Sequence, residues 1–309
     1  MKPLVALFFL FTLSVPARGQ DFDKGMEAYE RGDYATALDD LRPLAEEGRV
    51  EAEFQLGVMY FLGVGVPQDV VEAVKWYQKA AEQGHVVAQV MVALQHETMR
   101  DHAEAAKWYR KAADQGNADA QYSLGVLYDR GQGVPQDDAE AVRLYHLAAE
   151  QGLADAQLNL GVMYSLGQGA AQDDAEALKW FRKAGEQGHA EAQNVLGWIY
   201  RKGKGVPYEY AEAAKWYRLA ADQGHAEAQF NLGVMYHMGH GVPKDSVEAY
   251  KWYELGASHY PPGDARDMAA KLRDSIALAM TADQIAEAQR LAREWTPSKA
   301  RPKLDAGSE

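Results

Sequence analysis

Apolar side chains recur along most of the chain at spacings of three and four residues, which is the period of an amphipathic helix. In the segment 188–223 (GHAEAQNVLGWIYRKGKGVPYEYAEAAKWYRLAADQ), Ala192, Leu196 and Tyr200 share one face of a first predicted helix. A second apolar stripe, with offsets of 0, 3, 4, 7 and 8, is made of Ala213, Trp216, Tyr217, Ala220 and Ala221. The segment is therefore predicted to form two helices joined by a turn.

The turn between the two predicted helices has its own signature. In Gly203-Lys204-Gly205-Val206-Pro207 the glycines accept positive φ, and the proline cannot continue a helix. An acidic residue followed three positions later by Glu resembles a capping box for the second helix. Such pairs are Asp69/Glu72, Asp137/Glu140, Asp173/Glu176 and Asp245/Glu248. A terminal Gln-Gly then closes the second helix, with glycine just beyond its end.

Two residue types carry information about packing inside the unit. A glycine recurs in the middle of the first helix at positions 57, 125, 161, 197 and 233, although glycine there costs about 1 kcal/mol relative to alanine. Close approach of the paired helix, which a Cβ would push away, is the predicted compensation. The tryptophans at positions 76, 108, 180, 216 and 252 fall on the second stripe, and we expect them to be core residues rather than an aromatic cofactor box.

Six such units begin with a glycine, and a fixed period of this kind is the signature of a solenoid. The predicted repeats are 48–83, 84–115, 116–151, 152–187, 188–223 and 224–259. The second repeat is degenerate: Val92-Ala93 replaces Leu-Gly, and the turn shrinks to Thr98-Met99-Arg100. Either this repeat is a tuned site or its turn has simply drifted, and the sequence favours drift.

Capping segments are predicted at both ends of the array. Residues 20–47 are expected to form an N-terminal helix pair, and residues 260–296 a C-terminal cap that covers the last repeat. The expected helices in these segments are Met26–Arg31, Tyr34–Glu47, Asp264 to about Leu278, and a helix capped by Thr281 with Gln284 that runs to Trp295. Residues 297–309 lack periodicity and are predicted to be a disordered tail.

The shared pattern A-x-A-Q-x-x-L-G-x-x-Y-x-x-G-x-G-V … D-x-x-E-A-x-K-W-Y-x-x-A-A-x-Q-G resembles the Sel-one-like repeat family, a branch of the tetratricopeptide-type solenoids. It covers residues 48–259, about two thirds of the chain. The resemblance implies an all-α, right-handed superhelical stack of antiparallel helix pairs. It also implies adaptor or assembly roles, often in bacterial envelopes or in secretion, but it does not identify a partner.

The N-terminus has the pattern of an export signal. Lys2 precedes the apolar stretch from Leu4 to Val15, which is too short to span a bilayer comfortably, and Ala17-Arg18-Gly19 supplies small residues two apart. We predict a signal peptide over residues 1–19, with cleavage after Ala17 or an uncleaved anchor as the alternatives. A periplasmic or secreted protein is therefore expected.

Charge and composition exclude several classes of function. The formal net charge of −13 disfavours nucleic acid and anionic lipid as partners. The absence of cysteine excludes disulfides, thiol catalysis and thiolate metal sites. Some cysteine-rich family members are described as penicillin-binding or β-lactam-hydrolysing, but this chain lacks their cysteines and any serine with a lysine three positions later. We therefore expect a non-catalytic protein without a cofactor.

Histidines do not form a convincing metal site in the sequence. His237 and His240 are three residues apart with no third ligand nearby. His85, His189 and His225 recur beside the glycine that ends a helix, where a cationic imidazole would suit the helix dipole. No metal site is predicted.

The concave face of the stack is the remaining candidate for binding. Counted from each starting glycine, positions 4, 7, 11, 14 and 15 of the first helix are expected to line it. The predicted partner-binding residues are Phe54, Phe61, Tyr122, Leu158, Trp198, Arg201, Phe230 and His237. An apolar, partly aromatic groove suits an extended peptide. Positions 7 and 11 could instead be partly buried, and burial is favoured for the valines at 58, 126, 162 and 234.

These features predict an exported, monomeric scaffold that holds protein partners, with envelope proteins as the expected class. Binding of a glycan or cell-wall fragment by the aromatic groove is the main alternative. A hydrolase acting on β-lactams or the cell wall is a third and weaker hypothesis.

Overall fold

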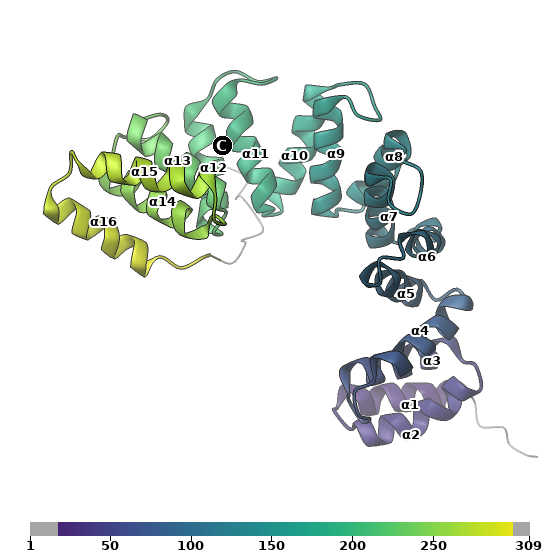
Figure 1. Ribbon diagram of the computed structural model, residues 1–309. Helices are drawn as coiled ribbons and strands as arrows, with labels where there is room; N and C mark the ends of the chain where they lie inside the picture. The colour runs from purple at the N-terminus through teal and green to yellow at the C-terminus, as the bar shows by residue number, and fades with distance from the viewer. Residues whose placement is uncertain (1–17, 299–309) are drawn as a thin grey trace, which may run out of the picture. The chain divides into compact units, whose positions relative to one another are not determined.

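Turn glycines and acidic caps divide the chain into helices of nearly equal length (Figure 1). The computed structural model describes residues 18–298, and this part of the chain contains α-helices and no strand. The helices are α1 (Arg18–Glu30), α2 (Tyr34–Glu46), α3 (Val50–Leu62), α4 (Val70–Glu82), α5 (Val86–Thr98), α6 (His102–Asp114), α7 (Ala118–Arg130), α8 (Asp138–Glu150), α9 (Ala154–Leu166), α10 (Asp174–Glu186), α11 (Ala190–Lys202), α12 (Tyr210–Asp222), α13 (Ala226–Met238), α14 (Ser246–His259), α15 (Asp264–Ala277) and α16 (Ala282–Glu294). The predicted all-α class is confirmed.

The helices fall into two units, with the division between Gly116 and Asn117. The N-terminal unit holds α1 to α6, and the C-terminal unit holds α7 to α16. Within each unit, a first helix packs on the second helix of its own pair and on the second helix of the pair before it. This is the tandem helix-pair arrangement of an α-solenoid.

The predicted apolar stripes form the core. All five repeat tryptophans are buried, and Trp180 has no exposed surface. The mid-helix glycines face an aromatic ring of the second helix. A Cβ on Gly197 would lie 2.6 Å from Cδ1 of Tyr217, and one on Gly161 would lie 2.7 Å from Cε1 of Phe181. The predicted close approach is confirmed, and the nearest atoms belong to a ring rather than to backbone.

The predicted capping boxes are only half formed. The carboxylate of Asp69 accepts a hydrogen bond from the backbone N–H of Glu72, as expected of an N-cap. The Glu72 carboxylate, however, binds Lys75 at 2.8 Å. Lys75 lies three residues further along the same helical face, and it binds the Glu72 side chain that would otherwise reach back to the N-cap. Both halves of the box do form at Thr281 and Gln284, as predicted.

The long turns that contain Gly169 and Gly241 also cover a neighbouring repeat. A Cβ on Gly169 would lie 2.1 Å from the carbonyl oxygen of Asp138, the first residue of α8. Gly241 approaches the carbonyl oxygen of Tyr210, the first residue of α12, equally closely. The turn of one repeat thus lies over the start of the second helix in the preceding repeat.

The two ends of the described chain differ from expectation in detail. The first helix begins at Arg18 rather than Met26, and residues 1–17 of the predicted signal peptide lie outside the described range. At the other end, α15 and α16 both pack on α14. Ser298, placed in the predicted tail, donates from its backbone N–H to the carbonyl oxygen of Asp222 at 2.7 Å. The remainder of that tail, 299–309, lies outside the described residues.

Candidate protein-binding face

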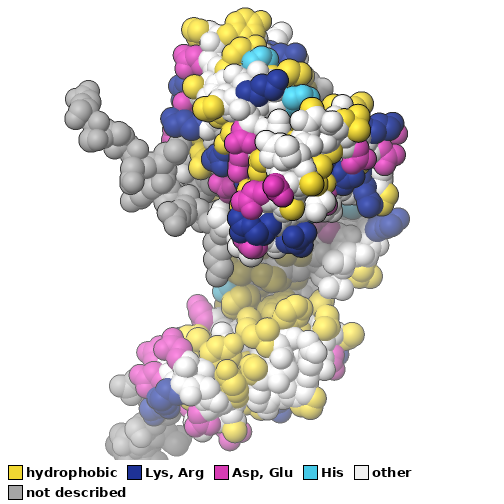
Figure 2. Space-filling model, turned by 90° about the vertical axis from the view of Figure 1, so that its left-hand side faces the viewer, with side chains coloured by type: hydrophobic (Ala, Val, Ile, Leu, Met, Phe, Trp, Pro, Cys, Tyr) yellow, Lys and Arg dark blue, Asp and Glu magenta, His cyan; other side chains and the backbone are white. Residues whose placement is uncertain are grey.

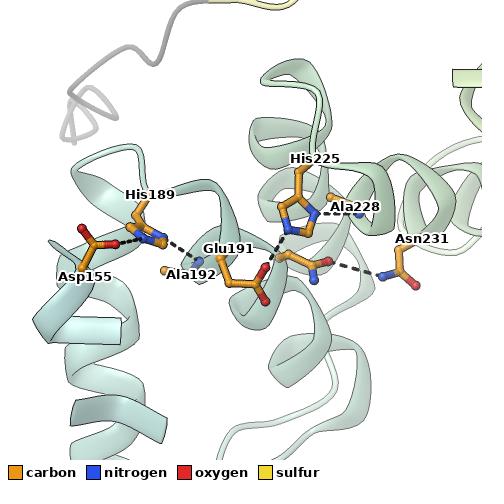
Figure 3. Close-up of polar contacts among 8 residues, drawn as sticks. Asp155, His189, Glu191, Ala192, His225, Ala228 and Asn231 are labelled. Carbon is orange, nitrogen blue, oxygen red and sulfur yellow. Dashed lines mark hydrogen bonds and ion pairs between the residues drawn. The ribbon is translucent and has the colours of Figure 1, made fainter. Parts of the chain in front are cut away.

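First helices of consecutive repeats in the C-terminal unit contact one another through side chains at nearby repeat positions (Figure 3). The Asn231 amide of α13 donates to the Asn194 oxygen of α11 at 3.4 Å. Between α9 and α11, His189 contacts the Asp155 carboxylate at 3.1 Å. We use the name first-helix face for positions 4, 7, 8, 11, 14 and 15 of these helices. It is built on rigid elements, so its side chains are held at fixed spacings.

The recurring histidines are N-caps, and the predicted role for a cationic imidazole is wrong. Nδ1 of His225 accepts a hydrogen bond from the backbone N–H of Ala228 at 3.2 Å, and Nε2 contacts the Glu191 carboxylate at 2.7 Å (Figure 3). An acceptor Nδ1 carries no proton, so the proton must sit on Nε2, which donates to Glu191. The hydrogen bond from His225 lowers the pKa of Glu191. Each histidine therefore belongs to the helix that begins after it, because the glycine before the histidine already ends the preceding helix.

Four of the predicted binding residues are half-buried. Phe54 and Phe230 each pack 5.7 Å, centroid to centroid, from a tyrosine ring of their own repeat, Tyr77 and Tyr253. Tyr122 packs in the same way against the ring of Tyr145. Leu158 contacts the buried cluster around Leu196 and Trp216. Position 7 therefore contributes to packing between helices, and Phe230→Ala would lose stability as well as surface.

Two further residues predicted to bind a partner instead contact the hydroxyl group of a buried tyrosine. Arg201 Nε donates to the hydroxyl of Tyr217 at 3.2 Å, and His237 Nδ1 lies 3.4 Å from the hydroxyl of Tyr253. Position 14 therefore satisfies the polar end of the ring that packs under the mid-helix glycine. Only the remaining two predicted residues, Phe61 and Trp198, present large apolar surfaces to solvent, with 48% and 41% of their areas exposed.

A buried ladder of glutamines crosses the repeats, and the sequence analysis missed its role. Gln193 on α11 accepts a hydrogen bond from Nε2 of Gln223, at the end of α12, at 2.8 Å. It also donates from its own Nε2 to the carbonyl oxygen of Gly185, in the preceding repeat, at 2.9 Å. Gln157 and Gln229 make the matching contact to the preceding repeat. The recurrence of glutamine at this position in five of the six repeats was the signal that could have revealed the ladder.

Glu53 stands in place of this glutamine in the first repeat. It is almost fully buried, and Nε2 of Gln83 donates to it at 2.7 Å. Burial raises the pKa of Glu53 above its ordinary value of 4.5, because the charged form loses hydration. A raised folded-state pKa means that the native state is favoured below pH 4.5 and loses this advantage as the pH rises through the folded pKa.

We therefore expect Glu53→Gln to raise the melting temperature at neutral pH. The amide would keep the contact with Gln83 and avoid burying a charge. Below pH 4.5 the protonated carboxyl is already neutral, so the substitution should change little there. Thermal melts of both proteins, followed by circular dichroism at neutral and acidic pH, measure the difference. An equal shift at both pH values would contradict the charge-burial explanation.

Six consecutive segments of the chain match the Sel1 repeat: 50–85, 86–117, 118–153, 154–189, 190–225 and 226–260. The chain belongs to the Sel1 repeat family. Each matched segment begins two residues after one of the repeat glycines recognised in the sequence. The degenerate repeat is among those matched. Proteins of this family are typically non-catalytic scaffolds that mediate protein–protein interactions.

Solved structures of Sel1 repeat proteins have the same fold. One, from uropathogenic Escherichia coli strains, is described as a protective antigen displaying an SLR fold; it is 32% identical, with a TM-score of 0.78, and the match covers 94% of this chain and 66% of that one. A Sel1 repeat protein from Oxalobacter formigenes is 33% identical, with a TM-score of 0.68, and the match covers 84% of this chain and 76% of that one. No curated protein sequence matches the chain.

Metal-binding groups and membrane-spanning helices are both absent from residues 18–298. No group of three or more histidine or carboxylate side chains in this range is arranged to hold a metal ion. None of the helices there has both the length and the apolar character needed to cross a membrane.

Proposed function

We propose that this Sel1 repeat protein is an exported scaffold that holds protein partners on its first-helix face. The observation that carries the proposal is the exposure of Trp198 on α11, whereas the other aromatic residues predicted for this face in the C-terminal unit, Tyr122 and Phe230, are half-buried. A tryptophan with a solvent-exposed face on a rigid helix supplies a large contact area with little ordering cost. Polar groups flank it at fixed positions, including the Asn194–Asn231 pair.

Site-specific crosslinking in the native cell tests the protein-binding role. A photo-crosslinking amino acid at position 198 should give discrete protein adducts, whereas the same group at exposed Lys215 on α12 should give few. Trp198→Ala should then lower affinity for the identified partner at least about tenfold while the protein stays folded. Adducts of equal yield at both positions, or unchanged affinity, would reject the proposed face.

Export is tested separately by cell fractionation and N-terminal sequencing. The predicted signal peptide ends at Gly19, so the mature protein is expected in the periplasm or the medium with Gln20 as its first residue. The description of the E. coli relative as a protective antigen agrees with a location accessible from outside the cell. An intact N-terminus in the cytoplasmic fraction would rule out export.

A further inference from the structure

The exposed large apolar side chains of the N-terminal unit are concentrated in one part of it. Within the described part of that unit they all fall between positions 61 and 99. Four of them, Phe61, Val87, Met91 and Leu94, have between 37% and 48% of their surface exposed. Phe61 lies in the last turn of α3, and the other three lie on α5 at spacings of four and three, which places them on one helical face. We name this set the α3/α5 apolar face.

In the degenerate repeat, two first-helix positions that are polar in most of the other repeats hold apolar side chains. Val87 occupies the position that is acidic in every other repeat, where the residues are Glu51, Asp119, Asp155, Glu191 and Glu227. Met91 occupies a position that is polar in four of the other repeats, where the residues are Gln55, Ser123, Asn159 and Asn231. Two apolar replacements on one exposed helical face gather apolar surface where most other repeats present polar side chains, and a clustered patch marks an interaction surface whereas a single exposed apolar residue does not.

The shortened turn of the same repeat uncovers more apolar surface. Gly65 of the first repeat packs over Tyr34, so that a Cβ on Gly65 would lie 2.6 Å from the Tyr34 carbonyl oxygen. The degenerate repeat lacks a matching turn over Val70, the first residue of α4, and 43% of Val70 is exposed. Because α4 and α5 are consecutive and antiparallel, Val70 lies at the same end of the unit as Met99, which is also exposed.

The fully charged side chains on the two helices of this face are all acidic. Neither α3 nor α5 contains a lysine or an arginine, while Glu51 is exposed on α3 and Glu97 is partly exposed on α5. Arg49, which precedes α3, is paired with Glu51 at 3.4 Å. Figure 2 shows hydrophobic side chains gathered on the N-terminal unit, in the lower half of the picture. Anionic lipid or nucleic acid would be repelled by such a surface, and a second copy of the face would bring like charges together.

We propose that the α3/α5 apolar face binds an amphipathic segment of a partner protein, with aliphatic side chains on one side and lysine or arginine beside them. The aliphatic side chains would lie on Met91 and Leu94, and the cations would meet the carboxylates of Glu51 and Glu97. This proposal rests on the scaffold function above and adds both the place and the chemistry of one partner. The degenerate repeat is then a tuned site rather than a drifted one.

The test uses the full-length protein and a fluorescently labelled synthetic helix made only of leucine and lysine. Fluorescence anisotropy should show saturable binding of this peptide, and a leucine–glutamate peptide of the same pattern should not bind. Met91→Asn, which restores the residue found at Asn159 and Asn231, and Leu94→Lys should each weaken binding at least about tenfold. Val162→Lys is the matched control, because Val162 has the position of Leu94 on α9 and is similarly exposed.

Each other result has a definite meaning. If Val162→Lys weakens binding as much as Leu94→Lys, the peptide occupies the first-helix face in general, so this inference fails and the scaffold function stands. Absence of binding by the leucine–lysine peptide, or equal binding by the leucine–glutamate peptide, also overturns it. Self-association abolished by Met91→Asn would identify a second copy as the occupant instead. Unchanged circular dichroism melts of the variants exclude loss of folding as the cause.

Discussion

Trp180→Ala is expected to lower the free energy of unfolding by about 3–5 kcal/mol, because it removes a fully buried aromatic side chain and leaves a cavity. Trp180 packs in the cluster that contains Tyr145, Leu160 and Met163, and Lys183 Nζ lies 4.0 Å from the centroid of its ring. The rest of the stack holds α10 between α9 and α11, so the site has little freedom to collapse.

Trp198→Ala is the matched control for this prediction. Because 41% of Trp198 is exposed, the same substitution should cost about 1–2 kcal/mol. Urea unfolding curves of both variants, followed by far-ultraviolet circular dichroism, measure the two losses. Equal losses would mean that Trp198 is a core residue, and its assignment to the binding face would then be wrong.

Gln193→Leu is expected to cost about 1–3 kcal/mol, because it removes the two hydrogen bonds that join three helices at one buried amide. Leucine has a similar volume, so the loss comes mainly from the polar groups left behind. Gln223 Nε2 also donates to the Leu219 carbonyl, and the Gly185 carbonyl also accepts from Gly188 N–H. Each group thus keeps at least one bond, which holds the cost below that of two fully unsatisfied groups.

Two comparisons isolate the contribution of the buried amide. Gln168→Leu removes the same side chain at an exposed turn position and should change stability by less than about 0.5 kcal/mol. Gln193→Glu keeps an acceptor for Gln223 but loses the donor to Gly185, so it should be most destabilising where the carboxylate is charged. Urea denaturation at neutral and acidic pH measures both. A loss in Gln193→Leu no larger than that in Gln168→Leu would contradict a structural role for the ladder.

Local sequence patterns were sufficient to predict the repeat helices, their pairing into repeats and the core face of each, although the start of α1 at Arg18 was not predicted. These features depend on interactions within about eight residues or on a period that repeats, so the stripe ending at Ala221 and the mid-helix Gly197 could be interpreted without a structure. The N-cap aspartates were predictable for the same reason, because a cap bonds to a backbone N–H only three residues away.

Contacts between repeats were decided only by the tertiary structure. His225 reaches Glu191 across 34 residues, and Gln223 reaches Gln193 across 30, and neither distance is encoded by a local period. The sequence placed Phe230 and Trp198 together on one binding face, but the ring of Phe230 packs on Tyr253 while Trp198 remains exposed. A side chain at the seam between two repeats is buried or free according to the shape of its neighbour, and that shape exists only after the stack has formed.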